Sequence, residues 1–95
     1  MDERTRTALE KAIQHWEKNA AGEFDGISCL ECPLCKLFLG NHYCSGCPVA
    51  EKTGAFCEGS PYEIAAMAQA RFGNVSPEFR AAAQKEVEFL VSLLP

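Results

Sequence analysis

The sequence predicts a small, mainly α-helical protein with three helices and an irregular, metal-organised cysteine-rich segment between the first and the second helix. Apolar residues recur at helical spacing within three stretches, residues 3–20, 61–72 and 77–93. Residues that favour helix starts precede each stretch. All six cysteines lie between the first two stretches. The length of 95 residues fits a single domain over residues 1–95.

The first predicted helix covers residues 3–20. Its apolar face steps by four, three and four residues through Leu9, Ile13, Trp16 and Ala20. Asp2 can cap the start, and Gly22 is suited to end the helix. We expect Trp16 to lie in the core and the neighbouring His15 to face solvent.

The sequence SPYE opens the second predicted helix, which covers residues 61–72. Ser60 is a favourable N-cap, Pro61 suits the first helical position, and Glu63 completes a capping box. Gly73 is placed to end the helix. The expected buried face consists of Ile64, Ala68 and Phe72.

The sequence SPEF opens the third predicted helix, which covers residues 77–93 and has Ser76 as its N-cap. Its apolar face consists of Phe79, Ala83, Val87, Leu90 and Leu94, widened by Ala81, Ala82, Val91 and Leu93. A face of this width favours burial inside the monomer, with a homodimer through this helix as the alternative. The simplest arrangement packs this helix against the first, with the cysteine segment and the second helix closing one end.

The cysteines follow the spacing C-x2-C-x2-C-x8-C-x2-C-x9-C. A C-x2-C turn lets two thiolates converge on one ion, and two such turns supply the four ligands of a tetrahedral zinc site. The predicted ligands of a structural Zn²⁺ are Cys32, Cys35, Cys44 and Cys47. The metal would organise residues 24–59, since a loop of this length is unusual in a compact domain and zinc binding can fold it.

Because two cysteines remain, an alternative to zinc is possible as the cofactor. Cys57 is the first candidate to replace one of the four ligands or to join them as a fifth participant. The run of Cys29, Cys32 and Cys35 looks like the start of a ferredoxin-type motif, which makes a [4Fe–4S] cluster the alternative. Thiolates suit both metals, so ligand type does not decide between them. A disulfide framework would need an oxidising compartment that nothing else in the sequence indicates.

Charge and composition narrow the function classes. The net charge is 9 − 13 = −4, which disfavours a nucleic-acid-binding zinc module because phosphates are held by Lys and Arg. No apolar run approaches the roughly 20 residues that span a bilayer, so we expect no membrane association. The charged start MDERTRTALE lacks a signal-peptide core, so we expect a cytoplasmic, reducing compartment.

No residue pattern predicts catalysis. The acidic residues form no paired-carboxylate signature, and clustered cysteines with metal spacing argue against a Cys/His nucleophile pair. His42 would form an H-x-C pair with Cys44, which is too tight for the usual zinc turns, so we expect it on the surface. The chain is therefore predicted not to be an enzyme.

Four stretches, HWEKNAAG, CPLCKLF, CSGCPVAEKTG and FCEGSPYE, together resemble a group of small cysteine-rich proteins encoded by phages and prophages. The shared pattern is a Trp-bearing helix followed by C-x-L-C, C-x-G-C-P-V, T-G and C-x-G-[ST]-P-Y. It falls on Trp16, Cys32, Cys35, Cys44, Cys47, Thr53, Gly54, Cys57, Ser60, Pro61 and Tyr62. The match covers residues 9–63 and leaves out Cys29. The resemblance implies a phage source and a metal site rather than an activity.

The predicted function is that of a non-enzymatic zinc-binding protein. Structural zinc would shape a surface for a protein partner, and the chain would act as an adaptor or inhibitor in the host cytoplasm. The alternative is an iron–sulfur redox or sensor protein. The partner itself is not specified by any residue in the sequence.

Overall fold

The structure is a computed structural model that describes residues 1–27, 33–38, 47–54 and 60–95. Within these ranges it has no strands and five helices, which are α1 (Glu3–Ala20), α2 (Pro33–Phe38), α3 (Pro48–Thr53), α4 (Tyr62–Phe72) and α5 (Pro77–Val91). The predicted mainly α class is confirmed. None of the helices in the described ranges is long and apolar enough to cross a membrane.

The predicted number of three helices is wrong, because α2 and α3 lie inside the segment that was expected to be irregular. Each of them has six residues and begins at a proline, Pro33 or Pro48, whose fixed φ suits the first helical position. Six residues make fewer than two turns, so apolar periodicity could not reveal them. The rest of the predicted metal-binding segment, residues 28–32, 39–46 and 55–59, lies outside the described residues.

The ends of α1 are formed by local hydrogen bonds that the sequence predicts. Oδ1 of Asp2 accepts a hydrogen bond from the backbone N–H of Thr5 at 2.7 Å, and this bond holds the pKa of the Asp2 carboxyl below its ordinary value. At the other end, the N–H of Glu23 donates to the carbonyl of Lys18 at 2.9 Å. Gly22 lies between them with a φ of 90°, a conformation that favours glycine.

Ser76 is the N-cap of α5, as predicted, whereas the N-cap position of α4 is Pro61 and not the predicted Ser60. Oγ of Ser76 accepts from the N–H of Phe79 at 3.1 Å. Oγ of Ser60 accepts from the N–H of Tyr62 at 3.2 Å, and α4 begins at Tyr62, one residue later than expected. The last helix ends at Val91, two residues before the predicted end. Differences of this size are common at helix ends.

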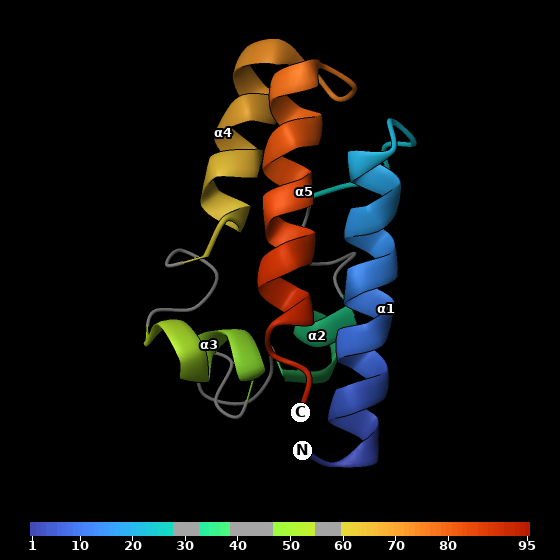
Figure 1. The fold of residues 1–95 in the computed structure, drawn as a ribbon, viewed down its shortest axis with the longest axis vertical. Coiled ribbons are helices and arrows are strands. Elements are labelled where there is room, and N and C mark those ends of the chain that lie inside the picture. Colours follow the sequence, from blue (N-terminus) through green and yellow to red (C-terminus); the bar gives the residue numbers. More distant parts are fainter. Residues whose placement is uncertain (28–32, 39–46, 55–59) are drawn as a thin grey trace.

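The α5 helix is the centre of the fold, with α1 packed along one side and α4 along another (Figure 1). The predicted packing of the first helix against the last is confirmed. The prediction that the second helix closes one end is wrong, because α4 lies beside α5. Contact with two helices accounts for most of the apolar face of α5, but Ala81 and Val91, which were predicted to widen it, are exposed. Its buried residues are Phe79, Ala82, Ala83, Glu86, Val87 and Leu90.

The face that α4 buries differs from the predicted one. Ala65 and Ala68 are buried, whereas Ile64 is 64 % exposed and Phe72 is 54 % exposed. Small side chains in the contact let the backbones of two helices approach closely. The alanines of α4 therefore face α5, and the large apolar side chains face outward.

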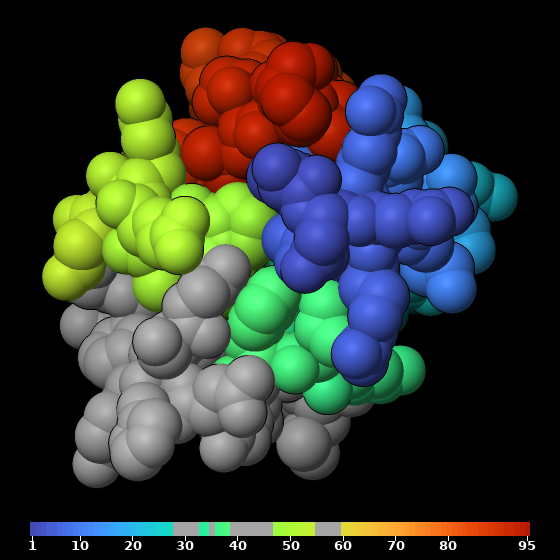
Figure 2. Space-filling model, turned by 90° about the horizontal axis from the view of Figure 1, so that it is seen from below, coloured from blue at the N-terminus to red at the C-terminus, as the bar shows by residue number. Residues whose placement is uncertain are grey.

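The two short helices lie at one end of the molecule, near both chain termini (Figure 1). Seen from that end, the start of α1, α2, α3 and the end of the chain surround a common centre (Figure 2). Leu34 of α2 and Val49 of α3 are buried in the same core cluster as Leu9 and Trp16 of α1. The cysteine-rich segment thus contributes to the core of the helical layers.

Candidate metal centre

Of the predicted zinc ligands, the structure describes the surroundings of Cys47 and the backbone position of Cys35. Cys47 is the N-cap residue of α3, and its side chain is only 5 % exposed. Cys35 lies in the middle of the short helix α2. The other cysteines and His42 lie outside the described residues; these cysteines are Cys29, Cys32, Cys44 and Cys57.

One cysteine of each C-x2-C pair lies in or next to a short helix that packs on the core: Cys35 in α2 and Cys47 at the start of α3. Leu34, next to Cys35, and Val49, two residues after Cys47, are both buried. In the part of the chain that the structure describes, no group of three or more His, Cys, Asp or Glu side chains could hold a metal. The zinc ligands, and the iron–sulfur alternative, therefore stay predictions from the cysteine spacing.

A polar cluster of buried Asn19 and His15 with exposed Asp25 fixes the chain where it enters the cysteine-rich segment. Nδ2 of Asn19 donates to the carbonyl of Gly26 at 2.9 Å, and Oδ1 of Asn19 accepts from the N–H of Asp25 at 2.6 Å. Nδ1 of His15 lies 2.7 Å from Oδ2 of Asp25, and because a carboxylate only accepts, this nitrogen carries the proton. These bonds hold residues 25 and 26 against α1.

His15 is buried, so the prediction that it faces solvent is wrong. Its ring meets that of Trp16 edge to face, with the centroids 5.6 Å apart. A second observation could have indicated this burial. Ala8, Ala12, His15 and Asn19 step by four, three and four residues, which places them on one face beside the Leu9 stripe.

The two ends of the cysteine-rich segment meet at Tyr62. The hydroxyl of Tyr62 donates to the carbonyl of Ile27 at 2.7 Å, across 35 residues of sequence. The Tyr62 ring also packs edge to face against Trp16, with centroids 5.9 Å apart. The two ends of the segment are therefore held together beside α1, which reduces the chain entropy that a bound metal would have to overcome.

Replacing Asn19 by alanine is expected to lower the free energy of unfolding by about 2 kcal/mol. Asn19 is fully buried, and its loss leaves the Gly26 carbonyl and the Asp25 N–H without their partner. Gln14→Ala, an exposed position of the same helix, is the matched control and should change stability by less than about 0.5 kcal/mol. Urea unfolding of both variants measures the difference, and equal effects would contradict the anchoring role.

Glu86 is a buried carboxyl that the sequence analysis did not single out. It is 3 % exposed in α5, and its Oε1 has no hydrogen-bond partner among the described residues. Burial raises the pKa of Glu86 to about 7, because the charged form loses its hydration. The sequence could have predicted that Glu86 is buried, since it stands four residues after Ala82 and four before Leu90 on the apolar face of the helix.

Comparison of the chain with known proteins assigns no family or function to it. No protein-family model, no curated protein and no solved structure matches the chain. The resemblance to phage-encoded cysteine-rich proteins accordingly stays a prediction.

Proposed function

We propose that this chain is a small, non-enzymatic metal-binding protein whose cysteine-rich segment is organised by one structural Zn²⁺ and serves as an adaptor or inhibitor of a protein partner. The proposed ligands are Cys32, Cys35, Cys44 and Cys47, with Cys57 as the first replacement. A cytoplasmic setting and a phage source are what the sequence and the resemblance suggest for it.

The observation that carries the metal proposal is the pair of six-residue helices, α2 and α3. Isolated helices shorter than about 12 residues are marginal in water, so both need support from outside themselves. Each helix starts directly after a proposed ligand, since Cys32 precedes Pro33 and Cys47 precedes Pro48. One ion bound by both C-x2-C pairs would hold the two helix starts together and supply that support.

The outer face of α4 supports the choice of a protein partner. Ile64, Met67 and Phe72 are large apolar residues, and each of them is more than half exposed. Apolar side chains gathered on one exposed element are common at protein–protein contacts. The net charge of −4, in contrast, disfavours nucleic acid as the partner.

Elemental analysis of protein purified without oxygen tests the metal proposal. We expect one zinc per chain, no iron and a colourless solution. Iron with inorganic sulfide in a brown solution would instead support the [4Fe–4S] redox or sensor protein, which the spacing of Cys29, Cys32 and Cys35 favours. Neither metal at stoichiometric level would contradict both functions.

Two serine variants then test the ligand assignment. Cys47→Ser is expected to lose most of its zinc, because serine does not replace a thiolate ligand. Cys29→Ser is the matched control, with the same substitution at a cysteine outside the two pairs, and should keep its zinc. The opposite result, with zinc lost only from Cys29→Ser, would overturn the assignment.

A further inference from the structure

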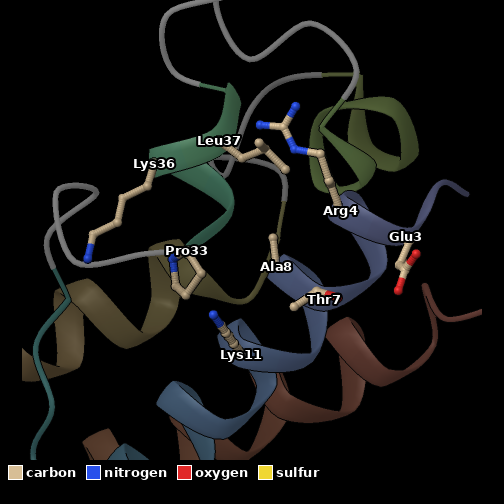
Figure 3. Close-up of a pocket in the computed structure, with 8 residues that line it drawn as sticks. All are labelled: Glu3, Arg4, Thr7, Ala8, Lys11, Pro33, Lys36 and Leu37. Carbon is tan, nitrogen blue, oxygen red and sulfur yellow. The ribbon is translucent and has the colours of Figure 1, made fainter.

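An open cleft of about 610 Å³ lies between the first half of α1 and α2. Apolar atoms form part of its lining, from Ala8 on α1 and from Pro33 and Leu37 on α2 (Figure 3). Ala8 is buried, while Pro33 and Leu37 are partly exposed. The cleft therefore offers a partner apolar surface that the fold itself leaves uncovered.

Three cations surround this apolar surface, although the chain as a whole is acidic. Arg4 and Lys11 come from α1, and Lys36 comes from α2. All three residues are exposed, and none forms an ion pair within the described ranges, where Arg6–Glu10 and His15–Asp25 are the pairs observed. Three of the nine Lys and Arg residues of the chain thus line one cleft.

One acidic residue, Glu3, also lines the cleft, which leaves a formal balance of 3 − 1 = +2 there. Its carboxylate points away from Pro33 and Lys36 (Figure 3). The tips of the three cationic side chains point in different directions and do not converge on one spot (Figure 3). This arrangement suits several separate negative charges better than one small anion.

We propose that this cleft binds an acidic, partly apolar segment of the protein partner. The proposal rests on the proposed function only in that the partner is a protein, and it does not depend on the identity of the metal. Carboxylates of the segment would pair with Arg4, Lys11 and Lys36, and its apolar side chains would cover Pro33 and Leu37. Charge complementarity in an otherwise acidic protein would steer and orient the segment.

The spacing of the cations indicates the spacing of the acidic residues. Arg4 and Lys11 are seven residues apart on α1, which is about 10 Å along a helix axis. In a polyproline II segment, side chains three residues apart point the same way and lie about 9 Å apart. A Glu at every third position, with apolar residues between, therefore matches both features of the cleft.

A nucleic acid fits the cleft less well. Its described lining has no aromatic side chain on which a base could stack. The net charge of −4 would also repel a phosphate chain that extended beyond the three cations. The binding experiment therefore includes an RNA as a competing ligand.

Fluorescence anisotropy with the metal-loaded full chain tests the proposal. The probe is a peptide in which Glu-Pro-Leu is repeated four times, capped at both ends and labelled with an uncharged dye. The control probe has Gln in place of Glu. We expect the Glu peptide to bind at least tenfold more tightly than the Gln peptide, and its affinity to fall as salt is raised.

Two triple variants with the same charge change locate the binding. Arg4→Gln, Lys11→Gln and Lys36→Gln together should weaken binding of the Glu peptide about tenfold or more, at roughly half a kcal/mol for each exposed pair. The matched control substitutes three exposed cations away from the cleft, Lys18→Gln, Arg71→Gln and Lys85→Gln, and should weaken it less than threefold. Circular dichroism and zinc content of both variants show whether each remains folded and loaded.

Three results would overturn the proposal. These are no binding of the Glu peptide at millimolar concentration, equal weakening by the two triple variants, and tighter binding of an oligo-uridine RNA than of the Glu peptide. Failure of the proposed metal function would look different. Wild-type protein without zinc contradicts that function, whereas loss of peptide binding from a zinc-loaded variant concerns the cleft alone.

Discussion

Removing the proposed Zn²⁺ is expected to abolish hydrogen-exchange protection in α2 and α3 while α1 and α5 keep most of theirs. The long helices α1 and α4 are each held by extensive contacts with α5. Of the two short helices, α2 packs on α1, and α3 makes no helix–helix interface of comparable extent within the described parts of the chain. Without the metal, neither helix is long enough to persist by itself. Residues 24–59 should therefore lose order first.

The expected effect is large. A structural zinc site with thiolate ligands contributes on the order of 10 kcal/mol to the folding of the segment that it organises. Hydrogen exchange followed by mass spectrometry, before and after treatment with a chelator, measures the change segment by segment. Adding Zn²⁺ back should restore protection, and Cys29→Ser should respond as the wild type does. Unchanged protection of α2 and α3 in metal-free protein would contradict the structural role of the metal.

Glu86→Gln is expected to stabilise the folded chain by about 3 kcal/mol at pH 8 and to have little effect below about pH 4.5. The pKa of Glu86 is raised from 4.5 to about 7 by burial, so the folded chain holds this proton more tightly than the unfolded chain does. The wild type therefore loses stability as the pH rises from about 4.5 to 7, at about 1.4 kcal/mol for each unit of pKa difference. A neutral glutamine removes this loss.

Urea unfolding of the wild type and of Glu86→Gln between pH 5 and 8 measures the effect. The difference between the two proteins should grow with pH and level off above about pH 7, while any pH dependence of metal binding is common to both. Glu88→Gln is the matched control, since Glu88 lies on the same helix and is exposed. Parallel stability curves for Glu86→Gln and the wild type would show that burial of this carboxyl carries no such cost.

The local features of the long helices could be predicted because neighbouring residues determine them. Asp2 and Ser76 cap their helices through bonds to N–H groups three residues away. Gly22 adopts the positive φ that ends α1. The short helices could not be predicted by periodicity, since each has only six residues and its buried side chains, such as Leu34 and Val49, meet parts of the chain distant in sequence.

The sequence predicted the candidate metal site but not the cleft, because only the first depends on residues close together in the sequence. Cysteine spacing predicts a metal site because C-x2-C pairs are local. The structure adds that Cys35 lies within α2 and that Cys47 directly precedes α3. The basic cleft joins residues of α1 to Lys36 of α2, which are separated by at least 25 residues of sequence. No local pattern connects such residues.

The sequence by itself thus determined the helical class, the caps at Asp2 and Ser76 and the spacing of the cysteines, all of which depend on residues a few positions apart. Tertiary structure alone decided which face α4 buries and that three cations line one cleft. These features depend on which helix lies against which. Periodicity shows that a face is apolar, whereas burial of a given side chain is decided by the shape and closeness of its neighbour.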